Sequence, residues 1–241
     1  MPTFSVAGRC DRTGMFGIVI ATKSIAVGSR CIAAEAGVGT VSSQAVTNPR
    51  LRRLALDGLR TGRSPEEVLA GLIAREPYAE RRQLLLVGRR GTGAAYTGTA
   101  ARPWAGQVVG DGLACGGNLL ASAQVADAMH AAFVSASRLH LADRLLTSLE
   151  AGKQAGGEIG GERSAALLVV DEDEFPLVDL RVDFHPEPIV ELRRIFEAYA
   201  PVMDYFRRRP DDPSLPTEDK WRRLAAPRAG TGRHDHPAAK G

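Results

Sequence analysis

The chain is poor in aromatic residues, and it lacks the surface pattern of a protein that reads nucleic acid. Aromatic side chains make up only 5% of its 241 residues, and no recognition motif interleaves them with basic residues. The net charge is a modest +3, from 31 basic and 28 acidic residues, and part of the basic excess lies beyond residue 206. We therefore expect no nucleic-acid partner.

Cysteine is also scarce, and histidine is not clustered. The three cysteines, Cys10, Cys31 and Cys115, are widely spaced and have no neighbouring histidines that would complete a zinc site. The glycine-rich segments at residues 14–17 and 156–161 lack the lysine and serine that follow the glycines of a phosphate loop. We expect buried, reduced thiols, no metal site and no cofactor.

Long hydrophobic runs are absent as well. No stretch reaches the ~20 apolar residues that a membrane helix needs. The first ten residues, MPTFSVAGRC, lack the basic segment and apolar core of a secretory signal. We expect no membrane association and a cytoplasmic location.

What the chain does contain is enough apolar sequence for one large core. Hydrophobic residues make up 44% of the chain and are spread evenly up to about residue 200. We predict a single domain over residues 1–206. Residues 207–241 are rich in arginine, proline and glycine and are predicted to form a disordered tail.

Local patterns predict alternating groups of strands and helices. Strands are expected at residues 3–9, 15–22, 37–44, 83–88, 94–97, 106–115, 164–170 and 177–182. Helices are expected from Asn48-Pro49 to about residue 60, after the N-cap Ser64 to about residue 75, and at residues 121–134, 139–151 and 187–206. Two helical pairs between groups of strands favour an α/β (α+β) sandwich of two facing sheets with helices outside them.

The chain start is a candidate chemical site because a strand is predicted to begin at Thr3. Such a strand would hold a backbone amine in a fixed position at the rim of a sheet. An α-amine has a pKa of about 7.7–8.0, so it can act as a base toward a hydroxyl on the same residue. Many strands at a chain start only pair a sheet edge, so this reading needs further support.

That support comes from a family resemblance that covers nearly all of residues 3–200. The segments that resemble the family include Thr3-Phe-Ser-Val-Ala, Ala36-Gly-Val-Gly39, Thr47-Asn-Pro49, Gly117-Asn118, Ser164-Ala-Ala-Leu-Leu-Val169 and Asp179-Leu-Arg-Val-Asp183. Together, and in this order, they resemble the DUF1028 family, a branch of the N-terminal-nucleophile (Ntn) hydrolase superfamily. The resemblance implies a four-layer αββα sandwich and hydrolysis of an amide-like bond by the N-terminal residue.

Two positions depart from the family pattern. The family start is similar to Met-Thr-Phe-Ser, whereas Pro2 precedes Thr3 in this chain. A free Thr3 amine therefore requires loss of Met1 and Pro2, by aminopeptidases or by self-cleavage of the Pro2–Thr3 bond. In the glycine-rich loop, Glu158 keeps an acidic charge, but Gly160 stands where the family has arginine, and Arg163 could supply a guanidinium from nearby.

Three residues are assigned to catalysis. Thr3 is the predicted nucleophile, and Asn118, after two glycines, is the predicted donor to a developing oxyanion, although it could instead cap a helix. Lys23, at the end of the second strand, could depress the pKa of the Thr3 amine, or it could simply be a solvated strand end.

A second set of residues is assigned to substrate binding. Ser5 shares the facing of Thr3 by strand alternation, and Arg181, Asp183 and His185 alternate along one predicted strand. Structural readings remain open for several of them, such as a turn and cap near residue 48 or a surface ion pair around residue 181. The full set is Ser5, Ser43, Gln44, Asn48, Arg163, Arg181, Asp183 and His185.

The leading functional hypothesis is an amidohydrolase that cleaves C–N bonds in small amides or peptide-like molecules through Thr3. Two alternatives stay open: a non-catalytic binding protein on the same fold, and tautomerase-like chemistry at an exposed Pro2. The expected partner is a small-molecule amide substrate. Folds of this kind commonly pair, so a homodimer also stays open, without a residue that argues for it.

Overall fold

A computed structural model describes residues 2–225 of the chain, and these residues fall into two compact units. The first unit spans Met1–Glu197 and the second Ala198–Gly241. The boundary lies between Glu197 and Ala198, whereas the sequence predicts the end of the domain at residue 206. The part of the predicted tail at residues 226–241 lies outside the described residues.

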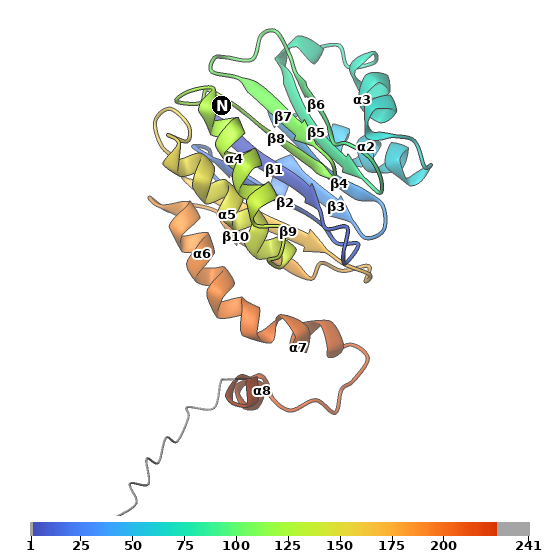
Figure 1. Cartoon of the computed structure of the whole chain (residues 1–241), viewed down its shortest axis with the longest axis vertical. Helices are drawn as coiled ribbons and strands as arrows, with labels where there is room; N and C mark the ends of the chain where they lie inside the picture. The colour runs from blue at the N-terminus through green and yellow to red at the C-terminus, as the bar shows by residue number, and fades with distance from the viewer. Residues whose placement is uncertain (1, 226–241) are drawn as a thin grey trace, which may run out of the picture. The chain divides into compact units, whose positions relative to one another are not determined.

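The first unit contains two antiparallel sheets (Figure 1). Sheet A has six strands, in the order β10 (Val178–Val182), β9 (Ser164–Val170), β2 (Phe16–Thr22), β1 (Thr3–Arg9), β8 (Leu113–Asn118) and β7 (Gly106–Gly110). Sheet B has four strands, in the order β3 (Ile32–Glu35), β4 (Gly39–Ala45), β5 (Arg82–Gly88) and β6 (Ala94–Thr97). The strand that begins at Thr3 is therefore central in its sheet, flanked by β2 and β8.

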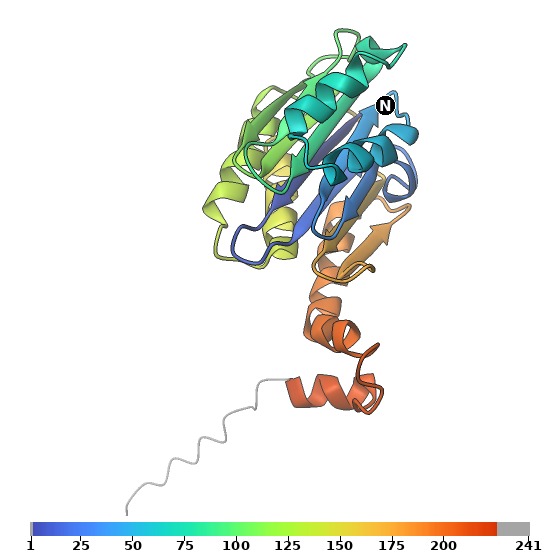
Figure 2. The same cartoon turned by 90° about the vertical axis from the view of Figure 1, so that its right-hand side faces the viewer.

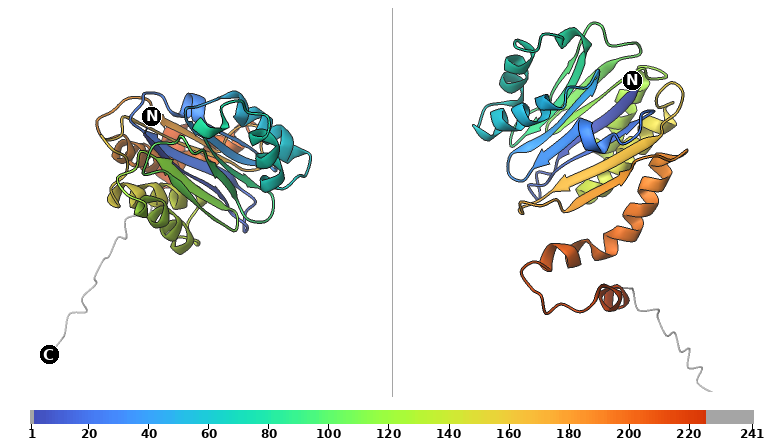
Figure 3. Two further views of the ribbon diagram at one scale, coloured as in Figure 1. Left: turned by 90° about the horizontal axis from the view of Figure 1, so that it is seen from above. Right: turned by 180° about the vertical axis from the view of Figure 1, so that it is seen from behind.

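Pairs of helices cover the outer faces of both sheets (Figure 2). The helices α2 (Arg50–Arg60) and α3 (Pro65–Ile73) pack on β4 and β5, while α4 (Gln124–Ser135) and α5 (Leu141–Gln154) pack on β8, β1 and β2. The two pairs lie on opposite sides of the strands (Figure 3), which confirms the predicted four-layer αββα sandwich. None of the helices described between residues 2 and 225 is long and apolar enough to cross a membrane.

Strand alternation explains why every residue of β1 is buried. Phe4, Val6 and Gly8 face the helices, where an added methyl on Gly8 would meet the ring of Phe133. The intervening residues point toward sheet B, and Ala7 there belongs to a cluster with Leu85. Because Thr3 and Ser5 follow the same alternation, their hydroxyls lie between the two sheets.

Most predicted elements form where the sequence places them. The helix after Ser64 begins with a capping box, in which the Ser64 hydroxyl accepts from Glu67 N and the Glu67 carboxylate accepts from Ser64 N. The predicted strand 106–115 is wrong in its extent: it is a hairpin of β7 and β8 with a turn at Asp111-Gly112, where Gly112 has φ 57°. The short helix α1 (Gly28–Cys31) and β3 have too few residues to give a periodic pattern.

The last predicted helix, 187–206, is divided. The chain forms α6 (Pro188–Tyr199), a 3₁₀ turn at Ala200–Val202 and α7 (Met203–Arg208), because Pro201 cannot donate the backbone hydrogen bond that would continue α6. A further helix, α8 (Glu218–Ala225), forms inside the predicted tail. Within the second unit, Trp221 of α8 lies 5.5 Å from the ring of Tyr205, an apolar contact that the local composition does not reveal.

Gly8 offers a test of the packing between β1 and the helices. A methyl group there would lie 2.5 Å from a ring carbon of Phe133, so Gly8→Ala should cost about 1–3 kcal/mol of unfolding free energy through overpacking. Urea denaturation followed by circular dichroism measures this loss. Gly106→Ala is the matched control, since its added methyl meets no atom within 4 Å. Equal destabilisation by both variants would contradict the packing of β1 described above.

Candidate active site

Thr3 lies at the rim of sheet A with its hydroxyl among polar neighbours. It is 4% exposed and pairs with Thr22 on β2 and with Asn118 on β8. Its Oγ1 donates to the carbonyl oxygen of Pro2 at 2.6 Å and lies 3.1 Å from Oγ1 of Thr22. The Thr22 hydroxyl donates to the same Pro2 carbonyl. Two hydroxyls therefore converge on the carbonyl of the peptide bond that precedes Thr3.

A pocket of about 570 Å³ opens beside this peptide bond. It is lined by Pro2, Ala45, Val46, Arg81, Ala100, Ala101, Arg102, Asn118 and Leu119. Two of these residues follow or end strands in left-handed backbone conformations that side chains with a Cβ rarely adopt: Ala45 has φ 68° and Leu119 has φ 52°. Such strained positions often cluster at functional sites.

A buried chain of side-chain hydrogen bonds runs between the two sheets to Asn118. Ser5 Oγ donates to Gln44 Oε1 at 2.7 Å, and Gln44 Nε2 donates to Gln83 Oε1 at 2.8 Å. Asn118 Nδ2 donates to the same Gln83 oxygen at 3.2 Å. The structure thus brings together Thr3, Ser5, Gln44 and Asn118 from the predicted set.

Gln83 is the centre of this chain. Its Nε2 lies within hydrogen-bonding distance of Gly117 O at 2.9 Å, Thr97 Oγ1 at 2.8 Å and Gly106 O at 3.1 Å. Each net hydrogen bond contributes about 1 kcal/mol, and a buried amide left without its partner costs about 1–3 kcal/mol. The orientation of Asn118 therefore depends on the Gln83 amide.

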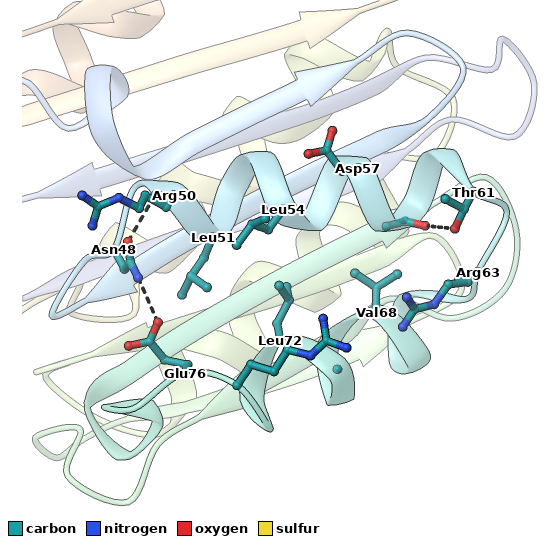
Figure 4. Close-up of a pocket in the computed structure, with 13 residues that line it drawn as sticks. Asn48, Arg50, Leu51, Leu54, Asp57, Thr61, Arg63, Val68, Leu72 and Glu76 are labelled. Carbon is teal, nitrogen blue, oxygen red and sulfur yellow. Dashed lines mark hydrogen bonds between the residues drawn. The ribbon is translucent and has the colours of Figure 1, made fainter.

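Ser43 and Asn48 lie on another face. Because of strand alternation, Ser43 points toward the helices, where its hydroxyl donates to Asn48 O at 3.0 Å. Asn48 lines a separate hollow of about 400 Å³ between α2 and α3, where its amide donates to Glu76 at 2.8 Å (Figure 4). Its Oδ1 accepts from Arg50 N, so here the capping role left open by the sequence is present.

Lys23 follows β2 and is exposed, and its ammonium group lies against the glycine-rich loop. An added methyl on Gly160 would be 2.7 Å from Lys23 Nζ. Gly160 itself has φ 89°, a backbone conformation that favours glycine. Arg163, in the same loop, has an exposed side chain, and its backbone N–H donates to Thr22 O at 2.8 Å.

The three residues around β10 lie apart from Thr3. Strands β2 and β9 separate β10 from β1, and β10 ends at Val182, so Asp183 and His185 do not continue its alternation. Arg181 pairs with Asp179 at 3.6 Å, with both side chains about half exposed, and His185 Nδ1 accepts from Glu187 N near the start of α6. The ion pair of Arg181 is therefore with Asp179, outside the predicted set, while His185 lies beyond the end of the strand as its structural reading proposed.

The sequence did not single out Glu158 as a site residue, yet its environment is unusual. Glu158 is 4% exposed, and neither carboxyl oxygen has a hydrogen-bond partner among residues 2–225. Burial, together with the neighbouring carboxylate of Glu162, raises the pKa of Glu158 to about 9. The carboxyl is therefore neutral at pH 7.

Two further site residues were also missed. Thr22 could have been found from the hairpin register, which sets it opposite Thr3. Gln83 carried a weaker signal, since it is a polar residue at the head of the apolar run Leu84-Leu-Leu-Val87. Its partners are 14 to 39 residues away, which is farther than any local rule reaches.

Comparisons with known proteins give one consistent match. A family model described as a family of unknown function, DUF1028, matches residues 3–192, so the match begins at Thr3. The crystal structure of protein SPO2555 from Silicibacter pomeroyi, which is also described by DUF1028, is similar to this chain. It is 33% identical with a TM-score of 0.76, and the match covers 83% of this chain and 89% of that one. No protein in a search of curated sequences matches significantly.

The raised pKa of Glu158 predicts a pH-dependent stability. Because the folded chain holds this proton between about pH 4.5 and 9 and the unfolded chain does not, the free energy of unfolding should fall as the pH rises through that window. In a chain that retains Pro2, Glu158→Gln should remove a fall of about 3–4 kcal/mol between pH 5 and 8, at ~1.4 kcal/mol per pH unit.

Urea denaturation at pH 5, 6.5 and 8 measures this slope. The exposed Glu66 in the first turn of α3 supplies the control, because Glu66→Gln should leave the slope unchanged. Parallel stability curves with and without Glu158→Gln, both in a chain that retains Pro2, would mean that the Glu158 carboxyl is already ionised in the fold.

Proposed function

The chain belongs to the DUF1028 family, whose function is unknown, and from that premise we propose that it is an Ntn-type hydrolase of amide bonds. Thr3 is its nucleophile once the residues before it are removed. The observation that carries the proposal is the position of the Thr3 hydroxyl, 2.6 Å from the Pro2 carbonyl oxygen at the edge of a pocket of about 570 Å³.

The contacts at Pro2 support release of Thr3 by self-cleavage. Oγ1 of Thr3 attacks the Pro2 carbonyl carbon, the C–N bond breaks, and the hydroxyl proton passes to the departing nitrogen. The result is an ester on Thr3 Oγ1 and a free α-amine, and water then hydrolyses the ester to release the preceding segment. The Thr22 hydroxyl, which already donates to the Pro2 oxygen, would stabilise the negative charge that develops there.

Turnover of a substrate would use the same hydroxyl with a new base. The α-amine of Thr3 takes the proton from Oγ1 as this oxygen attacks the amide carbonyl, and it passes that proton to the leaving amine. Water then hydrolyses the acyl ester on Oγ1, which releases the acid and restores the hydroxyl. Asn118 lines the pocket, and one of its two amide protons is used by Gln83. Its second proton can stabilise the oxyanion, while Ser5 and Gln44 act through the hydrogen-bond chain that positions Asn118.

The first test is the identity of the N-terminal residue. Intact-mass spectrometry of purified protein should show a chain that begins at Thr3. Thr3→Ala should retain the preceding residues if cleavage is autocatalytic, and a chain engineered to begin at that alanine should lose at least ~1000-fold of amidase activity, because both the nucleophile and the covalent step are gone.

The variant Thr22→Val separates cleavage from turnover. It should slow self-cleavage about 10–100-fold by removing one donor to the Pro2 carbonyl. Wild-type protein that hydrolyses amides while Pro2 remains in place would instead favour chemistry at Pro2. A retained Pro2 with no turnover would favour the binding-protein alternative.

The charged lining of the pocket points to the substrate's charge. Arg81 and Arg102 line it, and no acidic residue does so among the residues that the structure describes. Arg81 also contacts Glu80 at 3.3 Å, but both side chains are exposed, so this pair neutralises the pocket only weakly. The lining favours small amides that carry a carboxylate.

Matched substrates test this preference. Arg102→Gln should raise KM about tenfold for a carboxylate-bearing amide, because a charge-assisted hydrogen bond of about 1.5 kcal/mol is lost. KM for the corresponding methyl ester or primary amide should change less than twofold. Arg53→Gln, on an exposed position of α2, is the control. An equal rise in KM for charged and neutral substrates would contradict a role for Arg102 in charge recognition.

A further inference from the structure

The space ahead of β1 is bordered by known neighbours. Thr3 is the first residue of β1, and no residue before it pairs with β2 or β8 within those strands. The path of the chain before Thr3 is therefore flanked by the residues that follow β2 and β8, which are Lys23 and Leu119–Ala121. Residues 119–121, which follow β8, have one edge toward the β7 side of the sheet. That edge is already hydrogen-bonded, since Leu119 N donates to Arg102 O and Leu120 N donates to Trp104 O. The other side of residues 119–121 faces the path of β1.

The glycine-rich loop occupies that other side. Ile159 N donates to Leu119 O at 2.8 Å, and Ala121 N donates to Gly157 O at 3.0 Å, which sets Glu158 opposite Leu120. The loop then reaches the far flank of β2, where Arg163 N donates to Thr22 O and β9 begins. Residues 157–163 therefore cross the sheet rim in front of the start of β1.

Glu158 is buried in this crossing segment and its carboxyl oxygens lack hydrogen-bond partners among residues 2–225. The charged groups around it are Glu162, which is itself buried and paired with Lys153, and Lys23, whose ammonium lies at Gly160. The nearby backbone N–H of Lys23 also favours the ionised carboxyl, although it lies outside hydrogen-bond geometry. A buried carboxyl without a partner is costly unless another group completes it.

We propose that Glu158 is a positioning residue that holds the α-amino group of Thr3 in the processed chain. The proposal rests on the proposed function, because that amino group exists only after the Pro2–Thr3 bond is cut. Cleavage then removes Pro2 from the start of β1 and creates a cationic group at the place that faces the loop. The amine and the carboxyl complete one another as a buried pair.

The pair would orient the base for turnover. Because Glu158 holds the amino group, the glycine-rich loop fixes the position of the amino group beside Thr3 Oγ1. Without this contact the amino group would be a freely moving chain end. The neutral form of the amine takes the hydroxyl proton, and the adjacent carboxylate stabilises the ammonium that forms. The same pairing accounts for an acidic residue in a loop where burial otherwise opposes it.

The test measures the α-amine directly. A fusion partner cleaved immediately before Thr3 yields the otherwise full-length chain without any need for self-cleavage. The pKa of the Thr3 α-amine, from NMR titration or from the pH dependence of its acylation rate, should fall by at least about one unit in Glu158→Gln and by less in Glu158→Asp. Glu66→Gln is the control, and thermal melting checks that each variant folds.

A second measurement needs no change at Glu158, because Thr3→Ala supplies the chain that retains Pro2. Infrared difference spectra at pH 7 between the chain that retains Pro2 and the chain that begins at Thr3 should show loss of one buried protonated carboxyl. An α-amine pKa that is the same in wild type and a folded Glu158→Gln, or a protonated carboxyl that persists in the chain beginning at Thr3, would overturn the proposal. Neither readout requires turnover, so an inactive chain with a Glu158-dependent amine would reject the hydrolase and keep the amine site.

Discussion

The arrangement of the sandwich depends on a line of amides buried between its two sheets. Gln44 and Gln83 are cross-strand neighbours on sheet B, hydrogen-bonded to each other and to Ser5 and Asn118 of sheet A. Apolar contacts alone would tolerate small slips of one sheet over the other. A buried amide does not, because each lost partner costs about 1–3 kcal/mol. The network therefore sets the register between the sheets.

This register determines the chemistry available at the start of β1. Chain ends usually fray, but Thr3 begins a central strand of the six-stranded sheet and pairs with Thr22 on one side and Asn118 on the other. Asn118 is held in turn by Gln83. The proposed nucleophile and its proposed oxyanion donor are thus held by the same framework. Preorganised donors of this kind contribute to catalysis because they need no rearrangement as charge develops.

The glycine-rich loop differs from this network because it buries a polar group that has no partner. The Gln83 network satisfies its polar groups within the fold, whereas Glu158 is buried without a partner and next to a second carboxylate. Proteins depart from full polar satisfaction mainly where function requires it. Left-handed residues at Ala45 and Leu119, which line the same pocket as Pro2, add backbone strain at this end of the molecule.

The sequence alone determined the features that follow from neighbouring residues. It predicted the hairpin that opens the chain, the common facing of Thr3 and Ser5, the capped helix after Ser64 and the layered class of fold. Tertiary structure decided which distant segments meet: that Gln44 pairs with Gln83, that Asn118 lies beside Thr3, and that Glu158 is buried while Arg181 is not. The reason is the separation along the chain over which each interaction acts. Caps, turns and strand alternation act over a few residues, whereas packing between distant elements selects the partner of a buried polar group.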